Sequence, residues 1–416
     1  MAGQRTDPRV DDFYARLLTR GDARPVVIGA PEDDPVTEVI QVIADRILDF
    51  LGPAVRDRDV APLLRPDRVL IRTIPPAKVQ ALTVWIAPRH AIAVDRGLAL
   101  FLHRIARAFS SHVIVRGPAD PPPPAESETV GVIASILDWM ASPVHAPLVE
   151  DWPIGSRELK TAENFTTAAE RFVLGHEIGH ILHRHLIADG GHVDVRDASL
   201  ADLDVRQLEQ ETAADATAIV TSIESMQHEG MDPRAAVAGM HFFLMALALV
   251  EKVGASLVDE THRRAEDRLA TCHDAIAERY GPDATILRSW AQQLDELLAR
   301  LGTAALDERR RRRSAATARM ERVFRETSWS RYDRDLARDE ALLGEVLALM
   351  RQSPGAVVEA LEQNLLDAGA YTDLIRAAPS RQALERDDTW RRHQVAHFIA
   401  RHSPQQVQDT LGVIGF

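Results

Sequence analysis

The sequence predicts a predominantly helical α+β protein with one small β-sheet in its first quarter. Apolar residues recur at helical spacing through most of the chain, which favours helices. Runs of β-type residues are confined to about 68–95, which indicates a sheet of few strands. A composition of 45% apolar and 27% charged residues is typical of a soluble globular protein.

The first quarter of the chain contains a predicted helix, three strands and a second helix. Residues 36–51 carry apolar side chains at helical spacing, and Gly52-Pro53 is expected to end that helix. The runs VLIRTI, LTVWIA and AIAV follow as three β-type segments separated by proline-containing breaks. Helical periodicity returns over 97–110, so we expect a helix to follow the sheet directly.

A proline-rich stretch over 117–128 is expected to be a loop, because prolines fix φ and lack amide donors. A short amphipathic helix is predicted at 130–143. A longer helix is expected to begin near Thr167, since Thr167 and Glu170 form a capping-box pattern, and to run to about Ile187.

Nearly everything from Pro233 onward predicts helix. The longest apolar run, 235–250, is shorter than the roughly 20 residues needed to cross a bilayer, so we expect a buried helix there and no stable membrane insertion. Breaks are expected where glycine and proline interrupt the pattern, at Gly254, Gly281-Pro282, Gly302, Ser353-Pro354-Gly355 and Ser403-Pro404.

A chain of 416 residues exceeds what one compact core usually holds, so more than one unit is expected. We expect an N-terminal extension over 1–64, a main domain over 65–302 and a helical domain over 303–416. The main domain is expected to carry a proline-rich insertion at about 110–165. The sequence does not indicate an oligomeric state.

Charge and cysteine content exclude several functions. Acids outnumber bases 62 to 49, for a net charge of −13, and this argues against nucleic acid as a partner. Within the C-terminal region, the basic run 309–313 is flanked by acids, so we expect a solvated helix face. Cys272 is the only cysteine, which favours a reducing cytoplasm and excludes a thiolate metal site. The N-terminus lacks the apolar core of a secretory signal.

The run His176-Glu177-Ile178-Gly179-His180 carries the chemistry of the chain. On an α-helix, residues four apart lie on one face about 6 Å apart, so His176 and His180 can hold one Zn²⁺. Glu177 would lie beside the open coordination position as the general base for peptide hydrolysis. Glycine inside a helix is unfavourable, so Gly179 suggests that another backbone or the substrate passes close.

The third zinc ligand is expected on another helix. His183 and Leu186 stand where an extended HExxHxxGxxH motif needs glycine and histidine, so a third histidine is excluded. Glu211 and Asp215 lie one turn apart on a helix predicted over 205–227. Glu211 would complete the ligand set, and Asp215 would accept the second ring N–H of His176; the alternative is a solvated helix face.

Four segments, in order, resemble those of the gluzincin peptidases related to the CAAX prenyl endopeptidases and the bacterial heat-shock membrane protease: WIAPRHAIAVDRGLALFL (85–102), VLGHEIGHILHRH (173–185), ETAAD (211–215) and THRRAEDRLA (261–270). The resemblance implies a zincin-type metallopeptidase core with a small sheet packed on the active-site helix. It implies zinc ligands at His176, His180 and Glu211, and a base at Glu177.

The same resemblance implies that His262 and Arg268 line the cleft and stabilise the developing oxyanion. Their alternative role is that of helix-surface residues beside Glu266 and Asp267. It also implies that the strand over 91–94 is the sheet edge on which an extended substrate pairs. The membrane spans usual in that family are absent here, so membrane-embedded substrates are not implied.

The function expected from the sequence is that of a cytoplasmic zinc endopeptidase acting on protein or peptide substrates. Two alternatives stay open: a regulatory peptidase-like switch specific for one partner protein, and a non-catalytic protein stabilised by zinc. Three other histidines are expected to lie outside the site: His183 as a structural residue, His192 as a solvated loop residue and His241 as a satisfied core residue.

Overall fold

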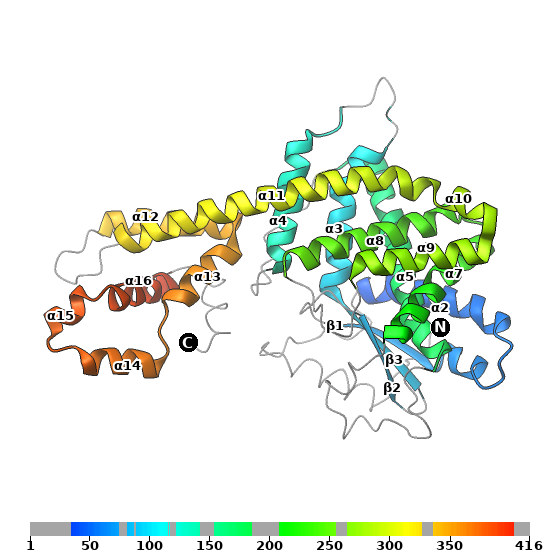
Figure 1. Ribbon diagram of the computed structural model, residues 1–416, viewed down its shortest axis with the longest axis horizontal. Helices are drawn as coiled ribbons and strands as arrows, with labels where there is room; N and C mark the ends of the chain where they lie inside the picture. Colours follow the sequence, from blue (N-terminus) through cyan, green and yellow to red (C-terminus); the bar gives the residue numbers. More distant parts are fainter. Residues whose placement is uncertain are drawn as a thin grey trace. The chain divides into compact units, whose positions relative to one another are not determined.

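The computed structural model describes residues 35–74, 81–86, 89–114, 116, 122–141, 154–184, 208–254, 264–326 and 336–402. The chain divides into two compact units. The first consists of Met1–Thr129 and Asp151–Thr303, and the second of Val130–Glu150 and Ala304–Phe416. The predicted fold class is confirmed, since the described residues are mostly helical with one small sheet (Figure 1).

Three strands form a mixed sheet in the first unit: β1 (Val69–Ile74), β2 (Ala81–Ile86) and β3 (Arg89–Asp95). β3 lies between the other two, parallel to β1 and antiparallel to β2. The three β-type runs of the sequence are thus confirmed as strands. The expectation that 91–94 forms the sheet edge is wrong, because β1 pairs along one side of β3 and β2 along the other.

Helix α2 (Pro35–Ala54) packs against β1 and against the long helix α5. Its apolar face joins a core cluster with side chains of β1 and β3. Gly52-Pro53 does not end the helix. The Val55 amide donates to the Leu51 carbonyl at 2.9 Å, so the last helical turn continues past the proline. A short 3₁₀ turn, η2 (Ala61–Leu64), then leads into β1.

Helix α3 (Arg96–Val113) follows β3 directly, as predicted. Asp95 caps it, because its carboxylate accepts a hydrogen bond from the Gly97 amide at 2.6 Å. Helix α4 (Glu126–Ala141) begins before the predicted start and takes in the end of the stretch expected to be a loop. Acidic residues in its first turn favour that earlier start, since they interact well with a helix N-terminus.

Helix α5 (Ser156–Leu182) is the central helix of the first unit. It begins well before Thr167, so the prediction of a capping box there is wrong. At Thr167 the backbone amides already have partners within the helix, and a cap has nothing to satisfy. The helix also ends earlier than predicted, at Leu182, and Arg184 just beyond it has a positive φ of 55°.

Helices α7 (Leu208–His228) and α8 (Arg234–Lys252) pack against α5, and α9 (Ala265–Tyr280) packs against α7 and α8. Helix α8 is the predicted apolar helix. By length and composition it could cross a membrane, yet 72% of its apolar window is buried inside the protein. The prediction of a buried helix is therefore confirmed. Aromatic contacts with α5 fix its position, with Phe172 and Phe243 ring centroids 5.7 Å apart.

Glycines mark two of the predicted breaks in this unit. Gly254 and Gly281 have φ values of 71° and 53°, which other residues rarely adopt. A 3₁₀ turn, η3 (Gly281–Asp283), and α10 (Ala284–Leu287) connect α9 to α11 (Ser289–Glu326). The break expected at Gly302 is wrong, because α11 continues through it. A Cβ there would lie 2.9 Å from Leu249 Cδ2, so Gly302 permits close helix packing.

The second unit contains its own apolar core, formed from α11 onward. The break at Ser353-Pro354 is confirmed, and Ser403-Pro404 lies outside the described residues. The helices that follow α11 are α12 (Leu336–Gln352), α13 (Pro354–Asn364), α14 (Ala368–Ala377), α15 (Arg381–Arg386) and α16 (Asp388–His402).

The basic run 309–313 lies on α11 and is neutralised by acidic partners. Arg309 is buried and pairs with Asp138 at 2.9 Å, and Arg312 pairs with Glu308 at 2.7 Å. The expectation of a solvated helix face therefore holds for the exposed members of the run and not for Arg309.

Candidate metal centre

Helices α5 and α7 approach each other through small residues. A Cβ added to Gly179 would lie 3.1 Å from the Cα of Ala214, and one added to Gly175 would lie 3.2 Å from the Cα of Ala218. The expectation that another backbone passes close to Gly179 is confirmed. The two backbones can lie this close because the contact contains only hydrogen or methyl side chains.

Polar contacts also link the same two helices. The buried Arg171 of α5 donates to Ser225 Oγ at 2.8 Å and to Glu229 Oε1 at 2.6 Å. Between the two glycine contacts, His176 of α5 contacts Asp215 of α7. These contacts set how far α7 is displaced along α5, and so which of its side chains lies beside the two histidines.

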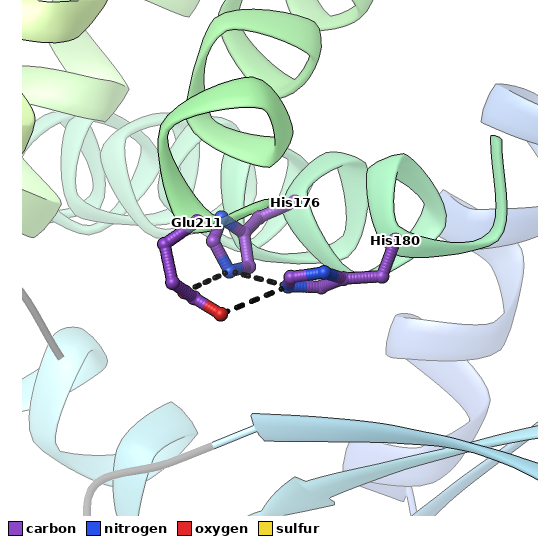
Figure 2. Close-up of side chains that lie close together, drawn as sticks. All are labelled: His176, His180 and Glu211. Atoms are coloured by element: carbon purple, nitrogen blue, oxygen red, sulfur yellow. Dashed lines mark hydrogen bonds and ion pairs between the residues drawn. The ribbon is translucent and has the colours of Figure 1, made fainter. Parts of the chain in front are cut away.

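Glu211 is the α7 residue brought to the histidine pair (Figure 2). The Nε2 atoms of His176 and His180 are 3.1 Å apart. Glu211 Oε2 lies 3.3 Å from His176 Nε2, and Glu211 Oε1 lies 3.5 Å from His180 Nε2. All three side chains are buried.

These distances fit one tetrahedral ion. Bonds of about 2.0–2.2 Å to nitrogen and oxygen place tetrahedral ligand atoms about 3.3–3.6 Å apart. Two imidazoles and one carboxylate form a donor set that suits Zn²⁺ and leaves one position open. Among the described residues, His176, His180 and Glu211 are the one group of at least three potential ligands close enough to hold a metal ion.

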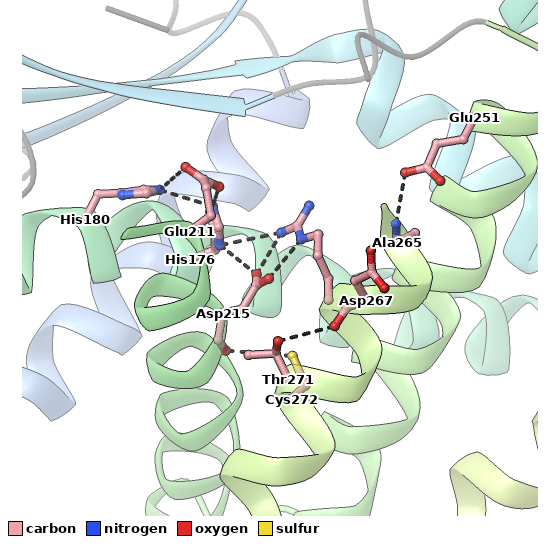
Figure 3. A network of polar contacts seen from close by, with 10 residues as sticks. His176, His180, Glu211, Asp215, Glu251, Ala265, Asp267, Thr271 and Cys272 are labelled. Atoms are coloured by element: carbon pink, nitrogen blue, oxygen red, sulfur yellow. Dashed lines mark hydrogen bonds and ion pairs between the residues drawn. The ribbon is translucent and has the colours of Figure 1, made fainter. Parts of the chain in front are cut away.

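Asp215 lies behind His176 and is fully buried (Figure 3). Its Oδ1 atom is 2.8 Å from His176 Nδ1. Arg268 of α9 holds the same carboxylate with two hydrogen bonds, from Nη2 to Oδ1 at 2.8 Å and from Nε to Oδ2 at 2.9 Å. A carboxylate at Nδ1 favours the tautomer that leaves the Nε2 lone pair of His176 directed at the ligand group.

Burial and neighbouring charges shift the pKa values of His176 and Asp215 in opposite directions. Burial alone would lower the pKa of His176, but the charge of Asp215 and hydrogen bonds from Asp215 and Glu211 raise it to about 9. Burial alone would raise the pKa of Asp215, but Arg268 and His176 hold it well below its usual range. Asp215 is therefore ionised at neutral pH.

Glu177 points toward the sheet. Thr83 of β2 donates a hydrogen bond from Oγ1 to Glu177 Oε2 at 2.6 Å and contacts the Glu177 carbonyl oxygen at 3.3 Å. Both side chains are buried. Thr83 pairs with Ile92 of β3, whose side chain is in the cluster facing α2 and α5, so the strand directs Thr83 at the helix.

Sequence reasoning did not identify Thr83. The signal in the sequence is a hydroxyl residue at an inward-facing position of a strand that otherwise alternates. That signal becomes specific only when the strand is known to lie against α5.

The remaining predicted residues have different outcomes. His262 and His192 lie outside the described residues. Arg268 contacts Asp215 and comes within 3.5 Å of His176 Nδ1, and its contribution to an oxyanion site stays a prediction. His183 contacts Thr217 Oγ1 at 2.7 Å and is not part of the ligand group, as expected.

Residues 126–284 match the model of one protein family, Peptidase U49. This part of the chain is therefore similar to the Peptidase U49 family. The matched segment extends from α4 to the start of α10 and includes the ligand group, Asp215 and Arg268. The members of that family are described as peptidases, so the similarity points to hydrolysis of peptide bonds as the activity to be tested. No curated protein and no solved structure matches the chain.

Proposed function

We propose that this chain, whose residues 126–284 match the Peptidase U49 family, is a zinc-dependent endopeptidase of the gluzincin type. In this proposal His176, His180 and Glu211 hold Zn²⁺, and Glu177 is the general base. The observation that carries it is the convergence of three buried ligand atoms from α5 and α7, all within 4.8 Å of one another. The HExxH spacing and the peptidase family support the same reading.

Bound zinc supplies Lewis-acid chemistry, since it polarises a carbonyl and makes a water molecule more acidic. Glu177 accepts the proton of the attacking water and transfers it to the leaving amine. Thr83 holds Oε2 of this carboxylate, so we assign the proton transfer to Oε1. Because the hydroxyl fixes one oxygen, the carboxylate needs little reorganisation when the substrate binds.

Asp215 and Arg268 are proposed as positioning residues. Asp215 orients the His176 ring, and Arg268 orients Asp215 through two hydrogen bonds. This geometry favours an indirect role for Arg268 over direct contact with the oxyanion. His262 keeps its proposed place as a donor to the oxyanion.

An extended substrate segment is proposed to pair with β2 and not with β3. β2 is an outer strand of the described sheet, and its Thr83 contacts the proposed base. Pairing along a strand gives main-chain hydrogen bonds with little dependence on side chains. We therefore expect cleavage of unstructured protein segments.

We propose a cytoplasmic location, because Cys272 is a single buried cysteine with no disulfide to form. The regulatory alternative has one supporting observation. The second unit has its own core, and most of it lies outside the matched segment, so it is available to recognise a partner protein.

The test measures bound zinc and the cleavage of an unstructured protein such as casein. Wild type and Glu177→Gln are expected to carry equal zinc, and only wild type is expected to cleave. Glu163→Gln, an exposed change on the same helix, is the matched control and should cleave normally. A wild type that binds zinc yet cleaves neither casein nor candidate partners would contradict the proposal.

A further inference from the structure

A second group of imidazoles lies in the first unit and shares no residue with the site above. His241 of α8 is 1% exposed. Its Nδ1 atom lies 2.8 Å from Asp295 Oδ1 of α11, and its Nε2 atom lies 2.5 Å from Nε2 of His273 on α9. Three helices thus each contribute one polar side chain to one point.

Asp295 determines which nitrogen of His241 carries the proton. A carboxylate at hydrogen-bond distance from Nδ1 takes the Nδ1–H, and this leaves a lone pair on Nε2. That lone pair points at Nε2 of His273. Because His241 is buried, this lone pair needs a partner within the protein, either a proton on His273 Nε2 or a metal ion shared by the two rings.

The arrangement resembles the first site in its carboxylate and ring spacing, although the two rings are inclined at 32° here and at 85° there. There too a carboxylate lies 2.8 Å from the Nδ1 of a buried histidine, and Nε2 faces the Nε2 of a second histidine. The ring centroids are 4.8 Å apart in His176 and His180, and 4.7 Å apart in His241 and His273.

We propose that His241 and His273 form a second metal site, for a divalent transition ion such as Zn²⁺, with Asp295 as the residue that positions His241. Imidazole nitrogen suits zinc, copper and nickel. Water completes the coordination, because His273 is only partly buried and the Asp295 side chain is 41% exposed. The ion would connect α8, α9 and α11, and α9 is the helix that carries Arg268.

The surroundings of His273 keep its ring neutral, as metal binding requires. Burial, followed by His241 and Arg288, lowers the pKa of His273 to about 4, against opposing effects of Asp295 and Asp274. His273 is therefore neutral at pH 7 and can present a lone pair. To accept an ion, the Nε2 atoms must separate from 2.5 Å to about 3.3 Å, and His273 has solvent on one side into which it can move.

The test compares the zinc content of full-length variants after dialysis against micromolar Zn²⁺, measured by mass spectrometry. Wild type is expected to carry one more ion per chain than His273→Gln. His112→Gln is the matched control, since His112 is a half-buried histidine that contacts Thr129 and no second histidine, and it should keep the wild-type content. If the site at His176, His180 and Glu211 bound no zinc, wild type and both variants would each carry one ion fewer. The difference in zinc content between wild type and His273→Gln would then stay the same.

A second variant, at the carboxylate behind His241, tests the same site with a change of nearly equal size that is not expected to disturb folding. Asp295→Asn is expected to weaken zinc binding at this site about 10- to 100-fold, as removal of a carboxylate behind a ligating histidine does. Equal zinc in wild type and His273→Gln would overturn the proposal and leave a hydrogen-bonded pair. Loss of an ion from His112→Gln as well would also overturn it, because the extra zinc would then be nonspecific.

Discussion

Replacing Thr83 by valine tests the assignment of Glu177 most directly. The two side chains have nearly the same shape, so the change removes one hydroxyl without opening a cavity. The lost hydrogen bond is 2.6 Å long and joins two buried groups, 1% and 3% exposed. Hydrogen bonds to charged groups contribute about 1.5–3 kcal/mol. If that contribution acts on the transition state, kcat/KM falls about 10- to 150-fold.

The assay is cleavage of a casein-type substrate by proteins whose zinc content has been measured. Thr83→Val should keep its zinc but show a lower kcat/KM. Thr83→Ser retains the hydroxyl and should keep most of the wild-type kcat/KM. A merely structural role for Thr83 would lower stability in both variants without this difference in rate. Normal kcat/KM in Thr83→Val with full zinc would refute the assignment of Thr83 to the base.

Three further predictions follow from the geometry of the site. Glu211→Ala should lose bound zinc in a metal analysis, whereas the exposed neighbour change Glu209→Ala should keep it; equal zinc in the two would remove Glu211 from the ligand set. Gly179→Ala places a methyl group 3.1 Å from the α7 backbone and should lower the free energy of unfolding by about 1–3 kcal/mol in a denaturant titration. The control Gly344→Ala, whose added Cβ would meet nothing within 4 Å, should leave that free energy unchanged or raise it. A larger loss of stability in Gly344→Ala than in Gly179→Ala would contradict the close approach of the two helices. In EDTA-treated protein, the pKa of about 9 for His176 lies above the unfolded value of about 6.5, so its protonated form stabilises the fold fully below pH 6.5, and this contribution is lost as the pH rises to 9. Denaturant titrations across that range should show the fall, and a flat profile would argue against the buried ion pair.

Local patterns predicted most elements but not how they pair. The three β-type runs, bounded by proline-containing breaks, were enough to identify β1, β2 and β3. Strand order was not accessible, because the pairing of β1 with β3 depends on contacts distant in sequence. The same limit explains the helix that begins at Ser156. A capping pattern at Thr167 is a local signal, and the helix around it is buried on several sides, so packing overrides the signal.

The residues of the candidate site were likewise predictable where one local motif contains them, and not where distant segments meet. His176 and His180 share a helix, so their spacing alone predicts their meeting. Glu211 came from a second motif with ligand chemistry. Thr83 lies 94 residues from Glu177 in the chain, and no pattern within either segment records their contact. The pairing of Arg268 with Asp215 likewise depends on how α9 lies against α7.

The glycine and alanine contact between α5 and α7 also affects how the metal centre could move. Because that contact is made by hydrogen and methyl groups, the polar contacts of Arg171 with Ser225 and of His176 with Asp215 define the alignment of α7 along α5. A slip of one residue is only about 1.5 Å, yet it would carry Glu211 away from the two histidines. Loss of one of these polar contacts is therefore expected to disturb the ligand set while both helices stay folded.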